Sequence, residues 1–156
     1  MTAIEPLCNL IGATSLLLSK EERILLEAEL FTRIHEELKE LFREQQKNYF
    51  RLLKLSKEQE DIMLESKFAH LIVKDILATG EYNLQGIAYY TDTYEDVIEE
   101  LIDGRNTNPS ATLLKRLINL HRSVRRDLYN LVVKKLLANI QNNKQSEFFA
   151  QGKIYV

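Results

Sequence analysis

The chain has few of the residues that interrupt helices or cross-link loops. Among its 156 residues are two prolines, five glycines and one cysteine. Because proline and glycine end helices, their scarcity beside many Leu, Glu, Lys, Ile and Gln residues predicts long helices and an all-α fold. The single cysteine, Cys8, excludes an intramolecular disulfide and a cysteine-based structural metal site. We therefore expect the protein in a reducing cytoplasm.

The sequence also shows no pattern typical of a targeting signal or a membrane-spanning segment. Residues 1–18 are moderately apolar, but they lack a basic leader and are interrupted by Glu5, Pro6 and Asn9. A signal peptide needs the basic leader, and a membrane helix needs about 20 continuous apolar residues. We expect a short capping segment here and no membrane partner.

The arrangements typical of catalytic or metal sites are absent from the sequence. His35, His70 and His121 are far apart and show no H-x-x-x-H spacing, and Cys8 has no histidine near it. There is no glycine-rich phosphate loop and no G-x-S-x-G turn. We predict a non-enzymatic protein without cofactor or metal, whose histidines serve the core or the surface.

Charged residues are plentiful, and their sign changes along the chain. Residues 58–103 contain twelve acids and two bases, whereas residues 104–135 contain eight bases and one acid. Such asymmetry occurs where a basic face binds a polyanion. It also occurs where an acidic surface docks on a basic one, within a chain or between two copies. The charge pattern leaves both interpretations open.

Apolar periodicity predicts a long first helix. Ser19 is a helix cap followed by two carboxylates, and apolar residues then recur at three- and four-residue steps to Phe42. The pattern continues more weakly to Leu55, with a candidate break near Lys47. Such a helix must bury its apolar stripe against the rest of the chain or a second copy. We interpret residues 1–64 as an N-terminal arm and candidate dimerisation element.

Cap residues mark the next two helices. Ser56 begins a helix that Gly80 ends, because glycine readily adopts the left-handed conformation of a helix terminus. Asn83 then caps a short helix that ends near Tyr90.

Two more helices are expected before the C-terminus. Thr93 and Asp96 have capping-box spacing, so a helix is predicted from Thr93 to Asp103, with Gly104 as its stop. A single helix with an apolar stripe and a basic flank is predicted over residues 110–142. The apolar residues of the remaining tail are expected to fold back onto the core.

Residues 82–122 have the order of features found in a helix-turn-helix unit. Ile87 and Ala88 pair a large and a small apolar residue in the first short helix, and Ile98 and Leu101 are the apolar positions of the second. Gly104, a polar loop ending in Pro109 and Ser110, and a leucine-rich helix follow. Over residues 66–122 the chain resembles the Cro/C1-type (Xre-like) helix-turn-helix domain of phage repressors and bacterial regulators.

This resemblance implies a helix-turn-helix-like domain over residues 65–122, followed by a C-terminal basic helix and tail over residues 123–156. It also implies a dimeric transcriptional regulator that docks on paired half-sites of double-stranded DNA. Arginine offers charge-assisted hydrogen bonds to phosphate oxygens, and Asn and Thr offer neutral ones. The implied DNA contacts are Thr93, Tyr94, Arg105, Asn106, Asn108, Lys115 and Arg116. A polar turn and a solvated helix flank are the alternative interpretations.

The second short helix departs from the family in its chemistry. Leu84 replaces a glutamine that touches the DNA backbone, and Asp92 replaces a turn glycine, which the fold tolerates because Asp can enter left-handed turns. Four acids, Glu95, Asp96, Glu99 and Glu100, occupy positions where the family has Gln, Ser, Thr, Arg or Lys. Carboxylates beside phosphates oppose the attraction on which DNA binding depends.

The acids therefore support a second interpretation. The protein would keep the helix-turn-helix scaffold but act as a non-enzymatic interaction or adaptor protein. Its binding face would be Tyr94, Glu95, Asp96, Glu99 and Glu100.

Overall fold

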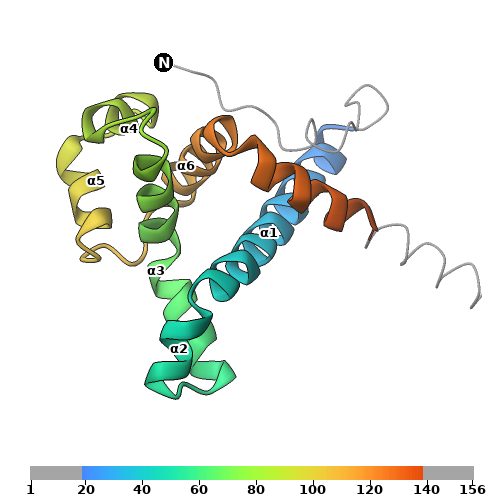
Figure 1. Cartoon of the computed structure of the whole chain (residues 1–156). Coiled ribbons are helices and arrows are strands. Elements are labelled where there is room, and N and C mark those ends of the chain that lie inside the picture. The colour runs from blue at the N-terminus through green and yellow to red at the C-terminus, as the bar shows by residue number, and fades with distance from the viewer. Residues whose placement is uncertain (1–18, 139–156) are drawn as a thin grey trace, which may run out of the picture.

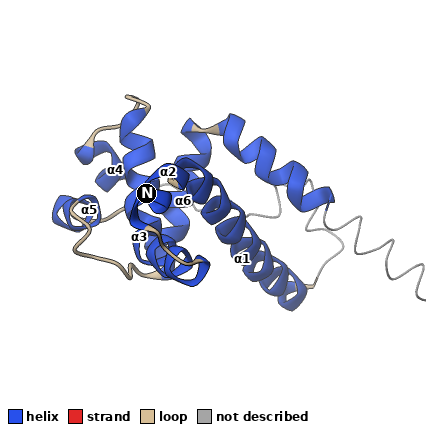
Figure 2. Ribbon diagram, turned by 60° about the horizontal axis from the view of Figure 1, so that its bottom comes forward, coloured by secondary structure: helices blue, strands red, loops and turns tan. Residues whose placement is uncertain are grey.

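The computed structural model describes residues 19–138, and these residues form an all-α fold (Figure 1). The helices are α1 (Lys20–Gln45), α2 (Lys47–Leu53), α3 (Lys57–Ala78), α4 (Leu84–Tyr90), α5 (Glu95–Ile102) and α6 (Ala111–Val124). Residues 126–138 form a further helical stretch, named here the C-terminal segment. Figure 2 shows helices and loops but no strand within this range. The predicted fold class is confirmed. The expectations for residues 1–18 and for the tail lie outside the described residues.

The first long helix begins and ends close to the expected places. The Ser19 hydroxyl accepts a hydrogen bond from the Glu22 amide at 3.1 Å, which satisfies one of the free donors at the start of α1. The helix breaks at Gln46, next to the candidate break, and α2 follows. The apolar stripe of α1 packs against the rest of its own chain through Leu30, Ile34, Leu38 and Phe42.

Helix α3 is the central element and contacts α1, α5 and α6. Ser56 and Gln59 form a reciprocal capping box at its start, with hydrogen bonds of 3.2 and 2.9 Å. Just past its end Gly80 has a φ of 76°, a left-handed conformation that favours glycine. Figure 1 shows α3 between the long α1 and the small α4–α5 pair.

Charged side chains fix α1 on α3. Arg43 of α1 forms ion pairs with Glu60 at 2.8 Å and with Asp61. One turn earlier, Lys39 pairs with Glu65 at 2.9 Å. These contacts flank the apolar interface, so they align the two helices along their length.

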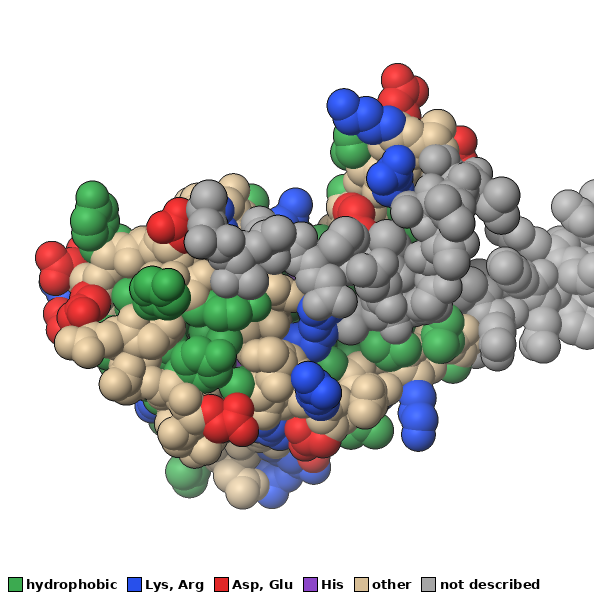
Figure 3. Space-filling model, turned by 90° about the horizontal axis from the view of Figure 1, so that it is seen from above, with side chains coloured by type: hydrophobic (Ala, Val, Ile, Leu, Met, Phe, Trp, Pro, Cys, Tyr) green, Lys and Arg blue, Asp and Glu red, His purple; other side chains and the backbone are tan. Residues whose placement is uncertain are grey.

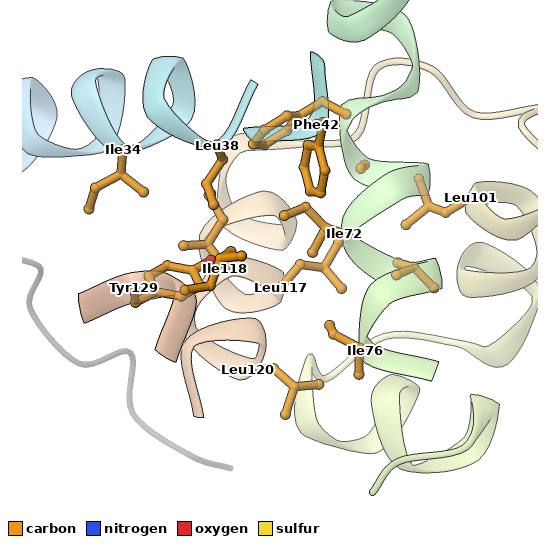
Figure 4. Packing of buried hydrophobic residues seen from close by; sticks show 14 of the residues in the cluster. Ile34, Leu38, Phe42, Ile72, Ile76, Leu101, Leu117, Ile118, Leu120 and Tyr129 are labelled. Carbon is orange, nitrogen blue, oxygen red and sulfur yellow. The ribbon is translucent and has the colours of Figure 1, made fainter. Parts of the chain in front are cut away.

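A single hydrophobic cluster joins all of these elements (Figure 4). Its members come from every helix, α1 to α6, and from the C-terminal segment, and include Ile34, Leu38, Ile72, Ile76, Leu101, Leu117, Ile118 and Tyr129. The cluster therefore crosses the segment boundaries drawn from the sequence, one of which, between residues 64 and 65, falls inside α3. Residues 82–122 and the N-terminal helices therefore share one core.

The predicted single helix over residues 110–142 is wrong. Helix α6 ends at Val124, and Arg125 has φ −128° and ψ 54°, outside the helical region. The helix resumes at residue 126 in a new direction, as the step from orange to red ribbon shows in Figure 1. The break places the Arg125 guanidinium on Asp75 of α3 and returns Tyr129 to His121. These tertiary contacts stabilise the bend. The local sequence contains no Gly or Pro from which a break could be predicted.

Candidate macromolecule-binding site

The turn between α4 and α5 is held by polar residues. Thr91 is fully buried, and its hydroxyl donates to the Ile87 carbonyl at 2.8 Å. Asp92 has a φ of 54°, a left-handed conformation that Asp adopts more readily than most residues. The Thr93 amide then donates to the Ala88 carbonyl at 3.0 Å. These bonds set the angle at which α5 leaves the turn.

Helix α5 starts two residues later than expected. Tyr94 is its N-cap residue, and no side chain caps the helix, so the predicted capping box of Thr93 and Asp96 is wrong. The reason is that the Thr93 amide belongs to the turn, where it is bonded to Ala88. On its inner side α5 buries Ile98 and Leu101 completely, and Ala88 of α4 is only 4% exposed. The small side chain lets the helices approach closely.

The outer side of α5 carries Tyr94, Glu95, Asp96, Glu99 and Glu100, named here the acidic face. Tyr94 is 82% exposed, three of the acids are exposed, and Glu100 is half-buried. Within residues 19–138 none of these carboxylates forms an ion pair. Figure 3 shows red acidic and protruding green hydrophobic side chains at the left end of the molecule, which α4 and α5 form. The acidic face is therefore available to a partner.

Beside the acidic face lies a polar hollow of about 310 Å³. It is bounded by the α4–α5 turn, the loop of residues 105–110 and the first turn of α6. Four of the seven residues expected to contact DNA line this hollow: Thr93, Asn106, Asn108 and Arg116. Residues from three separate segments of the chain thus share one surface.

The other expected contacts lie elsewhere, and the cations already have partners. Arg105 pairs with Asp103 at 3.0 Å on the exposed loop. The Lys115 ammonium lies 5.6 Å from the centre of the Phe31 ring, so it is directed towards α1. Arg116 reaches the hollow but donates to the Thr91 carbonyl at 3.2 Å. The expected phosphate-binding cations do not form a single surface.

A second cluster of ionisable residues, which the sequence did not reveal, joins α3, α6 and the C-terminal segment. The His121 Nε2 atom lies 2.6 Å from an Asp75 carboxylate oxygen, and its Nδ1 atom lies 2.9 Å from the Tyr129 hydroxyl. Arg125 donates to both Asp75 oxygens at 2.8 and 2.9 Å. We call Asp75, His121, Arg125 and Tyr129 the buried junction.

The buried junction satisfies its own polar groups. With Nε2–H donating to Asp75, the His121 Nδ1 atom accepts from the Tyr129 hydroxyl. Hydrogen bonding from His121, together with the charge of Arg125, lowers the pKa of Asp75 below its ordinary value. Burial raises the pKa of Tyr129 well above its ordinary value. His121 is fully buried, so the cluster holds helices together rather than facing a substrate. No sequence signal could have located the cluster, because Arg125 is of a residue type that favours helices.

Comparison with protein-family models, with curated proteins and with solved structures finds no match for this chain. Among the residues that the structure describes, no group of three or more His, Cys, Asp or Glu side chains is placed to hold a metal ion. None of the helices between residues 19 and 138 is both long and apolar enough to span a membrane.

Proposed function

We propose that this protein is a non-enzymatic, DNA-binding transcriptional regulator of the phage-repressor or Xre-like helix-turn-helix type. The observation that supports it best is the exposure of α5 beside the polar hollow, with Ile98 and Leu101 seated in the core. An α-helix fits the major groove of B-DNA, and a helix-turn-helix docks its second helix there. The cytoplasmic location expected from the sequence is part of the proposal.

In this mode the tip of α5, at Thr93 and Tyr94, enters the groove. Asn106, Asn108 and Arg116 of the polar hollow face the phosphates, and exposed Arg105 exchanges its neighbour Asp103 for a phosphate oxygen. Carboxylates on the acidic face can accept hydrogen bonds from cytosine N4. Their charge opposes non-specific binding, so we expect modest affinity, with a salt dependence that comes from Arg105 and Arg116.

A second candidate function is favoured by the acidic face itself. Its carboxylates lack ion pairs within the described residues, and two tyrosines, Tyr89 and Tyr94, are 87% and 82% exposed. Tyrosine is enriched at protein interfaces because it combines a large apolar area with a hydrogen-bonding hydroxyl. A protein partner with a basic surface fits this combination. The helix-turn-helix scaffold would then serve an interaction or adaptor role.

One triple variant separates the two functions, because the sign of its effect differs. Replacing Glu95→Gln, Asp96→Asn and Glu99→Gln removes three negative charges from α5. Affinity for a labelled random-sequence duplex should rise if α5 faces phosphates, since repulsion is relieved. Association with a basic protein partner should instead fall. A matched control replaces Glu44→Gln, Glu58→Gln and Glu81→Gln, three exposed acids outside α5 and away from the exposed start of α1.

The DNA proposal also predicts that single substitutions in the loop after α5 weaken duplex binding. Arg105→Ala should weaken duplex binding and lower its dependence on salt, whereas Asn108→Ala should weaken binding and leave the salt dependence unchanged, because its side chain is neutral. Titration at about 50 and 200 mM salt measures both effects. Absence of any association with duplex at the lower salt concentration would remove the DNA proposal and leave the protein-binding one.

The proposal includes a homodimer, as docking on paired half-sites requires. The buried stripe of α1 is occupied by its own chain, but Ile24 and Leu25 near its start are 59% and 70% exposed. This end of α1 is the surface that we expect to pair. Sedimentation of Leu25→Glu beside the parent chain tests it, and a parent chain that sediments only at 18.2 kDa contradicts the dimer.

A further inference from the structure

A cavity of about 160 Å³ lies between the α1–α2 junction and α3. Its apolar wall is formed by Tyr49, Phe50, Met63, Leu64 and Leu71. Its polar lining is Gln46, Lys67, His70 and Lys74, and no acid belongs to it. The cavity thus combines an apolar wall with a positively charged rim.

The two lysines of the rim are exposed, and they lack a counter-ion among the described residues. The Lys67 ammonium lies 5.9 Å from the centre of the Tyr49 ring, and neither Lys67 nor Lys74 forms an ion pair within the described range. In contrast, Lys39 of the same α1–α3 layer pairs with Glu65 at 2.9 Å. Lys67, His70 and Lys74 follow one another at three- and four-residue steps, so they share one side of α3.

His70 links this side of α3 to the helix-turn-helix unit. Its Nδ1 atom lies 2.9 Å from the Leu101 carbonyl in the last turn of α5. Because a carbonyl only accepts, Nδ1 carries the proton that is donated. The Nε2 atom has no partner within the described residues. His70 therefore holds α5 through Nδ1, while its Nε2 atom can only accept a hydrogen bond.

We propose that this cavity binds a small monocarboxylate with an aromatic or branched aliphatic body, of about the size of benzoate. An apolar cavity of about 150 Å³ accommodates benzene, so the body of such a ligand fits the apolar wall. The carboxylate then provides the negative charge that Lys67 and Lys74 lack. Most ligand sites combine an apolar lining with a few placed polar groups in this way. The proposal does not depend on whether α5 meets DNA or protein.

Two simpler ligands satisfy only half of the site. Inorganic phosphate would meet the lysines but leave the apolar wall in contact with water. Benzyl alcohol would cover the wall but leave the two ammonium groups without a counter-charge. These two compounds therefore serve as the comparison for benzoate.

The test is a titration of the full chain, labelled with nitrogen-15, followed by amide chemical shifts. Benzoate should produce saturable shifts around Lys67, His70 and Lys74, and also at Leu101, because His70 contacts its carbonyl. Phosphate and benzyl alcohol should produce no saturable shift at these positions. Absence of saturation by benzoate up to about 10 mM overturns the proposal, since even millimolar affinity would then be visible. Equal shifts with phosphate or with benzyl alcohol overturn it as well.

Substitutions of the two lysines test whether their charges bind the carboxylate. Lys67→Met and Lys74→Met keep most of the side-chain volume, and each should raise the benzoate Kd about tenfold, which equals one charge-assisted contact. Lys57→Met, at the exposed start of α3, is the matched control and should leave the Kd unchanged. Shifts that persist with the parent Kd in the Lys67→Met, Lys74→Met double variant overturn the assignment to this cavity.

Discussion

The buried junction and the acidic face are both rich in ionisable side chains, but they stand in opposite environments. At the buried junction, His121 and Arg125 both bond to Asp75, and His121 is completely buried. On the acidic face, Glu95, Asp96 and Glu99 are exposed and have no ion pair within the described residues. The charges of the buried junction pair with one another inside the protein, whereas those of the acidic face remain available to a partner.

This difference changes the meaning of the charge asymmetry along the chain. The basic residues after Gly104 suggested a surface for a polyanion, yet most of them contact their own chain. Arg125 binds Asp75 and Asp127, Lys135 lies 3.8 Å from Glu37, and Lys115 lies over Phe31. The acids of α5 receive none of these cations. Net charge per segment therefore says less about partners than the number of charges left unpaired.

The largest expected effect comes from removing the aromatic ring of the buried junction. Tyr129→Ala should lower the free energy of unfolding by about 3–5 kcal/mol. It leaves a cavity at a fully buried position and removes the hydrogen bond from the Tyr129 hydroxyl to His121 Nδ1. Tyr129→Phe, which loses only the hydroxyl, should cost about 1 kcal/mol. Urea unfolding followed by circular dichroism measures both. Equal losses in the two variants would show that packing of the ring contributes little.

Asp75→Asn should cost about 1.5–3 kcal/mol, because hydrogen bonds to a charged group are lost on two sides. The pKa of Asp75 is lowered in the folded state, so its ionised form stabilises the fold fully above pH 3.8, the ordinary value. That contribution disappears as the pH falls further, through the folded-state pKa. The difference in free energy of unfolding between parent and variant should therefore be constant from neutral pH down to about pH 3.8, and should decrease below it. A gap that already closes near neutral pH would assign the effect to another group.

Ala88→Leu tests the scaffold that presents the acidic face. The larger side chain has no space between α4 and the core, and overpacking of this kind costs about 1–3 kcal/mol. Tyr89→Leu, one residue further along but on the exposed side of α4, is the control and should change little. Thermal unfolding of the pair gives the result, and a tolerated Leu at 88 would contradict the close approach of α4.

The smallest expected effect comes from the acidic face. The triple variant Glu95→Gln, Asp96→Asn, Glu99→Gln should change stability by at most about 1 kcal/mol. Any loss should come from Glu95 and Asp96, which lie in the first turn of α5 where negative charge favours the helix. A larger loss, measured by urea unfolding beside the control triple, would mean that these acids support the fold instead of a partner.

Several local features could be predicted from the sequence because short-range chemistry decides them. Ser56 caps α3, Gly80 follows its end with a positive φ, and Asp92 adopts the left-handed turn. Each outcome depends on a residue and its near neighbours. The predicted cap at Thr93 failed for the opposite reason, since a bond to Ala88 in the preceding helix holds its amide in the turn.

The candidate site could be predicted only in part. The positions of Tyr94, Glu95 and Glu99 on one exposed side of α5 follow from helical spacing, and the structure places them there. The polar hollow joins Thr93 with Asn106, and it depends on how the loop folds back to α6. The partners of Arg105, Lys115 and Arg116 also depend on neighbours that helical periodicity does not locate.

Sequence by itself determined the all-α class, the main helix caps and the outward direction of the acids on α5. These features follow from backbone propensities and the period of the α-helix, which act over a few residues. Tertiary structure alone decided that the chain breaks at Arg125, that the basic residues are largely engaged within the protein, and that a cavity with a cationic rim lies beside α3. Such outcomes depend on contacts between residues as far apart as Asp75 and Arg125, because packing and charge pairing select their partners in space.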